Sequence, residues 1–560
     1  MVTGNCKDRV ISEHFKQLHE ETIKEFIPLI QKFDFDITVS TNQVIQICEK
    51  LSQGKAMAWD CVPDTSFKLC NDFKQQQFLI NQNKVKKIKQ LFTKEFWKDE
   101  KSAHHLLCRL VPLDKAYPNI PECSEYWPIV VASPVIKILE LLLLLKIQPF
   151  CEEFLNINQV GFMWGRSTMD NVIRLINDKK QMSNKGALLF LDMSSAYDNV
   201  IREKVYKIIE NKKMLNENEM KLFKFIHSNI EIKVGGKSCK TTRGAPQGLG
   251  TSPLFWNIYL NSLLEELGIK NFKVFAYADD LVIFIQNTCE IDEAIRTCFT
   301  WAENHNMKFN EKKSGLIILN NKKFKNLSNI KNIPLVNDYR YLGYEINRKC
   351  NLVTFMKWIR KKVFTIIPKI KFATDKLSLH KKRSILKTLI ISNFDYIGPL
   401  IMLANQKEVN KIKATIWKAT RMIFQLGPNV KNEIVEQLVS PNREKVWGRR
   451  ILKIKNNWTT KDVNLNTVKE ETILTKMNNM GESNKEFNLK DINPKIIDLL
   501  NIYNWAPCNE HENKFLNNEH LLEQHNINLD YKIIESLINN KDNTEISRLY
   551  VKLKELVEIN

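Results

Sequence analysis

Two short segments place carboxylates at the ends of apolar runs. In GALLFLDMSSAYDNV (186–200), an apolar run of strand length stops at Asp192. In FKVFAYADDLVIFI (272–285), two β-rich runs flank Asp279 and Asp280. Two to four residues between such runs mark a hairpin, so the adjacent acids are predicted to lie at its tip. An acid at the end of a buried strand is costly unless it has a partner or a task.

Divalent cations are the partner that these carboxylates suit. Mg²⁺ prefers oxygen ligands and completes its shell with substrate phosphates. Two such ions about 4 Å apart can activate a 3′ hydroxyl and stabilise the leaving pyrophosphate. Adjacent strand residues point to opposite faces, so only one of the two neighbouring acids is expected to line a site with Asp192, and we choose Asp279. The alternative, a solvated Asp-Asp turn, is the usual meaning of such a pair on its own.

Charge and composition indicate which partner such a site would serve. The chain has 560 residues, which predicts three or four domains, and a formal net charge of +21. Such an excess suits a polyanion, because each Lys or Arg on a phosphate releases a counterion; the alternative is an AT-rich genome that inflates Lys, Asn and Ile. Twelve scattered cysteines predict a reducing, intracellular compartment without structural disulfides. The most apolar run, 135–147, is too short to cross a bilayer, so no membrane partner is expected.

The elements around the acids follow from hydrophobic patterning. From about residue 40 to 345, amphipathic helices alternate with short β-rich runs, which predicts an α/β or α+β region. Residues 352–456 lack strand signals and read as helices with Lys and Arg on one face, which suits a groove that follows a phosphate backbone. Removing Arg360, Lys361, Lys362, Lys381, Lys382 and Arg383 together is expected to weaken the salt dependence of binding.

Near the end of the sequence, four potential metal ligands have a regular spacing. Cys508 and His511 are followed by His520 and His525, giving Cys-x2-His-x8-His-x4-His. Both short spacings suit one tetrahedral Zn²⁺. The alternative is a polar, histidine-bearing surface on a helical tail.

Taken together, these segments form an ordered set that resembles reverse transcriptases, most of all those of non-LTR (LINE-type) retrotransposons. The set covers roughly residues 50–455 in the order of the family. The matching boxes are Tyr277-Ala278-Asp279-Asp280 (the YADD box); Leu191-Asp192 with Ala196-Tyr197-Asp198 (the first catalytic box); Arg243–Gly248, Ser252-Pro253 and Asn257-Ile258-Tyr259 (the box between them); Asn158–Phe162, Gly165–Thr168 and Asp170 (a fingers box); Gly54-Lys55-Ala56, Asp60 and Pro63 (upstream of the fingers); and Lys308–Ser314 with Tyr341-Leu342-Gly343 (the last palm and primer-grip boxes).

The resemblance implies that Asp192 and Asp279 hold two Mg²⁺ or Mn²⁺ ions, with Asp280 close by. It places Tyr197 under the sugar of the incoming nucleotide, where a bulky ring would clash with a ribose 2′ hydroxyl and favour dNTPs. The alternative for Tyr197 is a core tyrosine. Lys313 matches the lysine proposed to protonate pyrophosphate; the nearby Lys308 and Lys312 leave that choice open.

Other residues are expected to touch the nucleotide. Gln247 would contact it, and Gly244 and Gly248 would let backbone approach the nascent base pair. Ser252 and Pro253 predict the start of a helix, with Ser as the N-cap. Arg166, in the fingers box, is a further candidate for binding the substrate.

One box departs from the family pattern. The family reads Arg-Pro-Ile where this chain has Trp127-Pro128-Ile129, and a Trp cannot make a charge-assisted bond to phosphate. Lys115, our first choice, Arg109 or Lys137 would then substitute, or the affinity for triphosphate is poor. For zinc, LINE-type proteins carry a Cys-Cys-His-Cys knuckle with a His-Leu-Leu before its last ligand, so two cysteines would here be replaced by histidines.

The resulting prediction is a right-hand polymerase of α/β plus all-α class that extends a DNA 3′ end on an RNA template with dNTPs. Its expected parts are an N-terminal helical extension (1–40), fingers (41–185), a palm (186–350), a helical thumb (351–456), a linker (457–500) and a knuckle-like module (501–560). The roughly 40 residues before the fingers and the roughly 35 after His525 are too short for an endonuclease, and no RNase H domain fits, so a separate endonuclease is an expected partner. A eukaryotic retroelement protein would act in the nucleus. Two alternatives stay open: a group II intron-like maturase or RNA-binding cofactor on the same fold, and a domesticated host polymerase.

Overall fold

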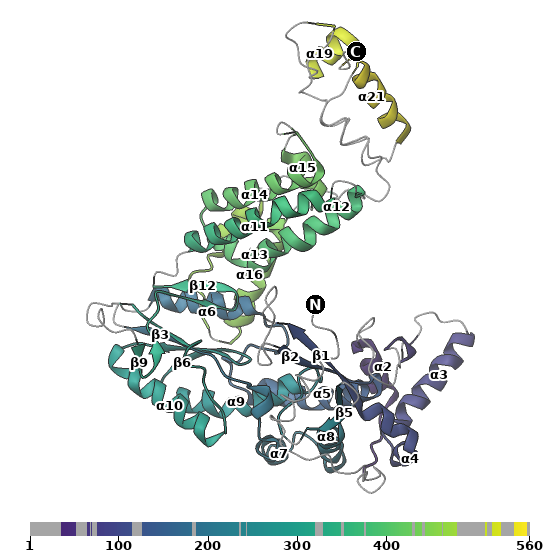
Figure 1. Cartoon of the computed structure of the whole chain (residues 1–560), viewed down its shortest axis with the longest axis vertical. Helices are drawn as coiled ribbons and strands as arrows, with labels where there is room; N and C mark the ends of the chain where they lie inside the picture. Colours follow the sequence, from purple (N-terminus) through teal and green to yellow (C-terminus); the bar gives the residue numbers. More distant parts are fainter. Residues whose placement is uncertain are drawn as a thin grey trace. The chain divides into compact units, whose positions relative to one another are not determined.

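The computed structural model describes residues 35–51, 64–67, 69, 75–114, 126–181, 186–234, 237–241, 243–319, 329–348, 352–374, 377–427, 430, 432–439, 443–461, 463–478, 510–511, 518–527 and 543–556 (Figure 1). Packing divides the chain into two units, Met1–Asn171 with Met182–Leu342, and Val172–Gln181 with Gly343–Asn560. Residues 1–34, most of the expected N-terminal helical extension, lie outside the described residues. Residues 35–40 are extended, and the first described helix begins at Thr41.

The first unit mixes helices and strands, as the patterning predicts. Its described helices and strands are α2 (Thr41–Lys50), α3 (Gln75–Gln90), α4 (Lys94–Lys98), β1 (Leu107–Asp114), β2 (Tyr126–Val131), α5 (Pro134–Phe154), the first residues of α6 (Thr168–Gln181), β3 (Ala187–Leu191), α7 (Arg202–Asn211), α8 (Glu217–Asn229), β4 (Glu231–Val234), β5 (Lys237–Lys240), α9 (Ser252–Ile269), β6 (Lys273–Tyr277), β7 (Asp280–Ile285), α10 (Ile291–Asn304), β8 (Gly315–Ile318), β9 (Asn329–Ile330), β10 (Ile333–Pro334) and β11 (Asp338–Tyr341).

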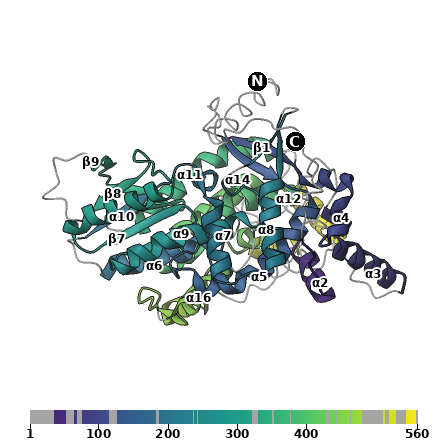
Figure 2. The same cartoon turned by 90° about the horizontal axis from the view of Figure 1, so that it is seen from below.

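The central sheet is antiparallel, in the order β6-β7-β3-β8. All five residues of β3 are buried, so this strand runs through the core. Helices α9 and α10 pack against each other, and they contact β6 and β7 respectively (Figure 2). Because α9 is apolar on all sides, it is buried along most of its length. The sheet thereby presents the ends of β3, β6 and β7 at one rigid edge.

A second sheet has the order β2-β1-β4-β5; β1 and β2 precede β3 in the chain, and β4 and β5 lie between β3 and β6. β1 pairs antiparallel with β2 and parallel with β4. The apolar run that follows β2 becomes α5, which begins after the N-cap Ser133 with Pro134 in its first turn and extends beyond the run to Phe154. Its buried face includes Glu140, a carboxylate that the run gave no reason to single out.

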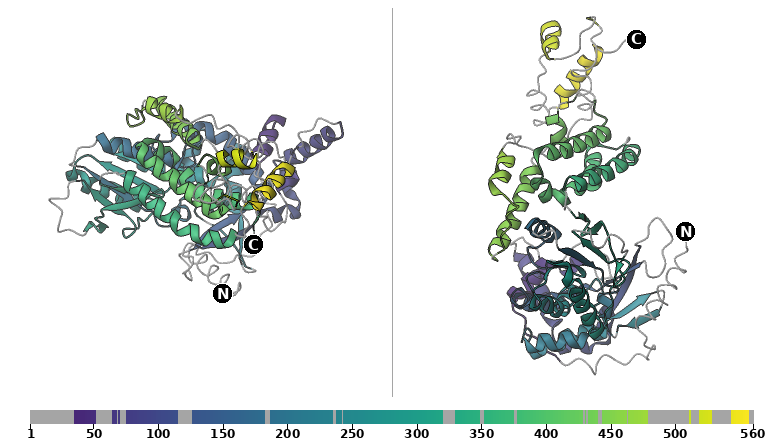
Figure 3. Two further views of the ribbon diagram at one scale, coloured as in Figure 1. Left: turned by 90° about the horizontal axis from the view of Figure 1, so that it is seen from above. Right: turned by 90° about the vertical axis from the view of Figure 1, so that its left-hand side faces the viewer.

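The second unit is mainly helical, which agrees with the expected thumb. It contains residues 172–181 of α6, β12 (Tyr344–Asn347), α11 (Leu352–Thr374), α12 (Leu379–Ile385), a π-helical turn (Leu386–Ile391), α13 (Ser392–Leu403), α14 (Gln406–Phe424), α15 (Asn432–Val439), α16 (Arg443–Thr459), α17 (Glu470–Asn478), α19 (Asn518–His525) and α21 (Asn543–Glu555) (Figure 3). Within it α11 packs on α14, and α13 packs on α16.

The expected linker at 457–500 is wrong for its first part. α16 continues to Thr459, and α17 packs against it. Trp458 is fully buried, and the guanidinium of Arg174 lies 3.8 Å from the centre of its ring. The Asn-rich composition suggested a linker, but a few large apolar side chains are enough to anchor the segment.

One continuous helical stretch, Leu379–Leu403, is long and apolar enough to cross a membrane by length and composition. More than half of its most apolar window is buried within the protein, as in the core helix of a folded domain. This stretch was not the run singled out in the sequence.

Candidate active site

Asp192 is the first residue after β3, and the segment that precedes β8 fixes its backbone. The Asp192 N–H donates to Ser314 Oγ at 3.2 Å, and the Asp192 carbonyl accepts from the Asn310 N–H at 2.8 Å. Ser314 Oγ in turn donates to the Asn310 carbonyl at 2.8 Å. Lys308 belongs to the same segment, since its carbonyl accepts from the Ser194 N–H at 2.9 Å. The lysines of this segment are thus tied to the backbone beside Asp192, with Lys313 exposed to solvent.

The β6–β7 hairpin carries the other two acids. Tyr277 pairs with Asp280, so Ala278 and Asp279 form a two-residue loop. Ala278 is buried and has a φ of +55°, a conformation that costs energy for a residue with a Cβ. Something outside the hairpin must therefore hold this loop.

Gln159 provides that support. Its Oε1 accepts from the Ala278 N–H at 3.0 Å, and its Nε2 donates to the Ala278 carbonyl at 3.2 Å. The Gly161 N–H also donates to Oε1, at 2.9 Å. A Cβ on Gly161 would lie 2.3 Å from the Ala278 nitrogen, so this approach requires glycine. The sequence showed this segment only as a fingers box, because nothing local reveals that it supports the catalytic turn.

The three carboxylates influence one another. The pKa of Asp280 is raised from its ordinary 3.8 to about 6. Partial desolvation of the carboxyl is the largest cause, and the charges of Asp279 and Asp192 add to it. We expected only one of Asp279 and Asp280 to line the site with Asp192, and we chose Asp279. In the structure, Asp280 is close enough to both other acids for their charges to act on it. Asp279 lies in the loop, where strand alternation does not apply, and the pairing of Leu191 with Leu281 brings Asp192 beside Asp280.

Two tyrosines flank the acids. Burial raises the pKa of Tyr339 to about 12, and the charges of Asp192 and Asp280 add to the shift. Burial also raises the pKa of Tyr197, with Asp279 as the next cause. The Tyr197 ring stacks on Trp256 with 5.7 Å between centroids. Tyr197 is therefore half-buried beside Asp279, in a place that fits a role at the sugar, although its packing on Trp256 also fits the core-tyrosine alternative.

The loop between Arg243 and Thr251 lies against Tyr197, and two of its glycines pack closely against other backbone segments. A Cβ on Gly244 would lie 2.7 Å from the Asp198 carbonyl oxygen, and one on Gly248 would lie 2.1 Å from that of Val130. Both have positive φ, +78° and +116°. The protein's own backbone therefore requires glycine at both positions, and the expected approach to a nascent base pair stays a prediction.

The rest of this loop is also described. The Gln247 carbonyl accepts from the Val130 N–H at 2.6 Å, and its side chain is half-buried. Ser252 is the first residue of α9 and Thr251 is the N-cap, so the predicted N-cap is wrong by one position. Ser252 Oγ instead donates to the Pro246 carbonyl at 2.7 Å, which closes the loop.

The candidates for triphosphate binding lie in different places. Arg166 is half-buried next to Asp170 and Glu152, and burial lowers its pKa. Arg109 is exposed on β1, and Lys137 lies one turn before Glu140 on α5, where its charge acts on that buried carboxyl. Lys115 lies outside the described residues, as does the side chain of Trp127, whose backbone pairs with Leu113.

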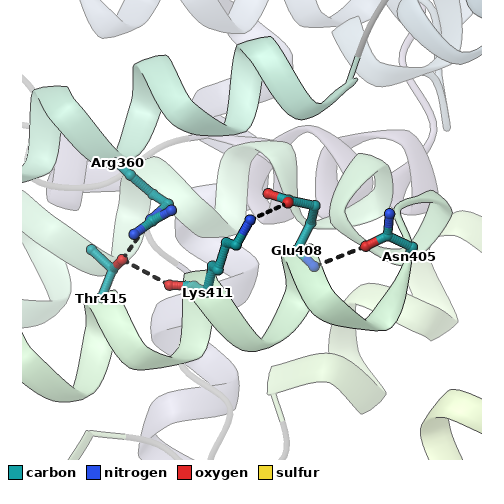
Figure 4. Close-up of polar contacts among 5 residues, drawn as sticks. All are labelled: Arg360, Asn405, Glu408, Lys411 and Thr415. Carbon is teal, nitrogen blue, oxygen red and sulfur yellow. Dashed lines mark hydrogen bonds and ion pairs between the residues drawn. The ribbon is translucent and has the colours of Figure 1, made fainter.

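Several thumb cations expected to bind phosphate have other roles. Arg360 Nε donates to Thr415 Oγ1 at 2.9 Å, linking α11 to α14 (Figure 4). The same face of α14 carries an ion pair of 2.6 Å between Lys411 Nζ and Glu408 Oε1. Lys382 and Arg383 are buried, which corrects their place in the basic face. Among the side chains of α11 and α12 that the structure describes, the exposed lysines are Lys357, Lys361, Lys362, Lys369 and Lys381.

The terminal region brings together part of the predicted zinc set. Ligand atoms of Glu510, His511 and His525 all lie within 4.8 Å of one another, and the two imidazole centroids are 5.1 Å apart. Glu510 was not predicted, because the spacing analysis considered only Cys and His. Cys508 and the side chain of His520 lie outside the described residues.

Asp280→Asn is expected to stabilise the metal-free protein at pH 8 and to leave its stability nearly unchanged at pH 4. Since the pKa of Asp280 is raised to about 6, the folded state holds the extra proton and loses stability as the pH rises from about 4 to 6. The gain at pH 8 is on the order of 1 kcal/mol, because the carboxyl is open to solvent. Thermal unfolding with a chelator measures it, with Glu303→Gln as control; a destabilised Asp280→Asn at pH 8 would contradict the proposed repulsion.

Known proteins with similar sequences include reverse transcriptases. Residues 114–346 match the family described as reverse transcriptase (RNA-dependent DNA polymerase). The RNA-directed DNA polymerase from mobile element jockey of Drosophila funebris is 22% identical over 300 residues, 47% of this chain and 31% of that protein. The probable RNA-directed DNA polymerase from transposon X-element of Drosophila melanogaster is 24% identical over 330 residues, 54% of this chain and 36% of that protein.

A shorter match is stronger in identity. The Pol polyprotein from type-1 retrotransposable element R1 of Nasonia vitripennis is 34% identical over 85 residues, 14% of this chain and 25% of that protein. This chain thus spans about a third or less of the length of these curated relatives. Apo telomerase from Candida tropicalis is similar at 10% identity and a TM-score of 0.37, covering 62% of this chain and 63% of that one, which is too distant to bear on the site. The region around the paired carboxylates is thus similar to the reverse transcriptase family, and the relatives that match it are described as RNA-directed DNA polymerases of mobile elements.

Proposed function

We propose that this chain is an RNA-directed DNA polymerase encoded by a retroelement, which extends a DNA 3′ end with dNTPs on an RNA template. The observation that carries the proposal is the cluster of Asp192, Asp279 and Asp280 at the ends of paired strands, where desolvation and then the two neighbouring carboxylates raise the pKa of Asp280. Oxygen ligands in this arrangement suit Mg²⁺ or Mn²⁺. When bound, two such ions would supply activation of the 3′ hydroxyl and charge neutralisation at the phosphates.

The surrounding residues would orient the substrates. Tyr197 lies beside Asp279 and would limit the room at the 2′ position of the sugar. The bond of the Gln247 carbonyl to Val130 would hold its half-buried side chain near the incoming nucleotide. Lys313, exposed in the segment that braces Asp192, is the candidate proton donor to pyrophosphate.

Nucleic acid is the partner that best fits the exposed side chains found in each of the two units. Phe162 is 58% exposed and Trp164 is 77% exposed, and the Phe162 ring lies 6.4 Å from that of Tyr277. Exposed aromatic rings stack on bases of single strands. The exposed lysines of α11 and α12 supply positive charge for a phosphate backbone. A separate endonuclease as partner, and a reducing compartment such as the nucleus, remain part of the proposal.

Asp279→Asn is expected to abolish nearly all Mg²⁺-dependent dNTP incorporation on a primed RNA template, because it removes a charged ligand from the carboxylate cluster. RNA affinity should stay within about twofold, because the substitution leaves the basic helices of the thumb unchanged. Primer extension and equilibrium binding measure the two properties, with the exposed Glu303→Gln as a matched control. Normal extension by Asp279→Asn would mean that the reaction occurs elsewhere.

Tyr197→Ala is expected to raise the use of rNTPs relative to dNTPs, because the ring no longer fills the space at the 2′ position. A tenfold change in the ratio of kcat/KM values corresponds to about 1.4 kcal/mol. The stacking of Tyr197 on Trp256 means that folding must be checked separately, by thermal unfolding. Tyr197→Phe, which keeps the ring, serves as control; an unchanged ratio in Tyr197→Ala would leave Tyr197 a packing residue.

We also propose that the terminal module binds one zinc ion through His511 and His525, with Glu510 as a third ligand and with Cys508 and His520 as the candidates for the fourth. The support is the convergence of carboxylate and imidazole donors within the 4.8 Å that one ion can bridge. Zinc bound there would hold α19 to the segment before it. Glu510 Oε2 lies 3.6 Å from His525 Nδ1, so these two donors already point toward a common position.

Purified wild-type protein is expected to contain about one zinc per chain and to lose it below about pH 5, because a protonated imidazole cannot ligate. Elemental analysis should show that Glu510→Ala and His525→Ala each reduce zinc retention. Glu523→Ala, an exposed acid on the same helix, should retain it. Wild-type protein without zinc, or equal retention in all three variants, would contradict the site.

A further inference from the structure

Arg202 is a buried cation that holds the first end of the loop between Arg243 and Thr251. Only 4% of it is exposed. Nε donates to the Gly244 carbonyl at 2.7 Å, and Nη2 donates to the Arg243 carbonyl at 3.2 Å. The remaining bonds run from Nη1 to the Thr241 and His227 carbonyls, at 2.8 and 2.7 Å, and from Nη2 to Thr241 Oγ1 at 2.7 Å. All five guanidinium N–H groups are thus engaged by uncharged acceptors.

Glu140 is a buried anion that holds the other end of the same loop. Only 1% of it is exposed. Oε2 accepts from the Gly250 N–H at 3.1 Å, and Oε1 accepts from the Thr251 N–H at 3.1 Å and from Thr251 Oγ1 at 2.7 Å. These amides precede α9, whose N-terminal dipole also favours a negative charge. Burial raises the pKa of Glu140, whereas its three hydrogen bonds from this loop lower it.

His227 joins the two charges into one buried block. Its Nδ1 lies 2.9 Å from the Phe223 carbonyl, so Nδ1 carries the proton and donates it. Nε2 lies 3.3 Å from Thr251 Oγ1, whose single proton is directed to the closer Glu140 Oε1. Its own carbonyl accepts from Arg202. Burial lowers the pKa of His227 to about 3, so the ring stays neutral at physiological pH. His227 therefore contacts Arg202, which holds the first end of the loop, and Thr251, which forms the other end.

The middle of the loop contacts Tyr197, the residue beside Asp279. The Ala245 N–H donates to the Tyr197 carbonyl at 2.8 Å, and the Gln247 carbonyl accepts from the Val130 N–H. Burying a charge costs several kcal/mol, which apolar packing alone would avoid. Two buried charges of opposite sign, one at each end of a nine-residue loop, indicate a need for a fixed loop geometry.

We propose that Glu140 and Arg202 are positioning residues, which act through the backbone of this loop to place Gln247 and Tyr197 against the incoming nucleotide. The inference rests on the proposed polymerase function and adds two residues that would not themselves touch the substrate. A displaced loop lowers nucleotide affinity while the carboxylate cluster stays intact. The expected signature is thus a higher KM for dNTP with a smaller change in kcat.

The test uses the full-length chain with Glu140→Gln and Arg202→Lys, each assayed by steady-state primer extension. Gln keeps the shape of Glu140 but turns an N–H group toward one of the loop amides; Lys keeps the charge of Arg202 but cannot satisfy five acceptors. We expect the KM for dNTP to rise at least tenfold in each, kcat to change less than threefold, and primer–template Kd to stay within twofold. Thr251→Val, which removes only the hydroxyl, should raise KM by a smaller factor.

Matched controls separate positioning from a general loss of buried charge. Glu219→Gln removes a buried carboxylate on α8 that pairs with Lys146 at 3.3 Å, and Arg174→Lys changes a buried arginine that stacks on Trp458. These should lower thermal stability without raising the KM for dNTP. If Glu140→Gln or Arg202→Lys fails to fold, Thr251→Val decides the result.

Two further outcomes would overturn the inference in different ways. Wild-type extension combined with an unchanged KM in all folded loop variants would show that the buried charges serve stability alone. A wild-type chain that incorporates no dNTP would overturn the proposed function, and this inference with it.

Discussion

Three carboxylates, brought together and partly removed from water, are the constraint around which the first unit is arranged. Asp192, Asp279 and Asp280 come from two sequence segments, and neither segment alone would force them together. The hydrogen-bond registers of β3 with β7 and of β6 with β7 do so. Because the uncompensated cluster opposes folding above the raised pKa of Asp280, the fully buried β3 and the apolar α9 must supply compensating stability. A site that needs metal cations can tolerate such repulsion, since a bound cation removes it.

Around this cluster, the protein commits much of its hydrogen bonding to turns and loops. Gln159 supports the left-handed Ala278, the 308–314 segment braces Asp192, and Glu140 and Arg202 hold the loop beside Tyr197. In each case a side chain bonds to backbone from a distant part of the sequence. Backbone partners fix position more tightly than flexible side-chain partners, which suits atoms whose distances determine a reaction.

The sequence predicted the elements of the site better than their supports. Strand-length apolar runs located Asp192 and the hairpin, because alternation and turn signals are local. Gln159, Glu140 and Arg202 could not be assigned, since each acts on residues more than 40 positions away. A further reason for Gly248 was equally out of reach, since the Val130 carbonyl beside it comes from a strand more than 100 residues earlier in the chain. Composition misled at 457–478, where Trp458 and Ile473 anchor an otherwise polar segment.

The grip of Gln159 on the hairpin limits how the first unit can move. Residues 158–161 also pair with β6 through the Val160 N–H to the Ala276 carbonyl and the Ala276 N–H to the Asn158 carbonyl. The Gln159 amide also bridges Ala278, so residues 158–161 and the β6–β7 hairpin are joined by several hydrogen bonds and are expected to move as one rigid body. Any hinge that opens this unit must therefore lie outside both of them. The catalytic turn and the neighbouring Phe162 would travel together, which keeps an exposed aromatic ring in constant register with the carboxylates.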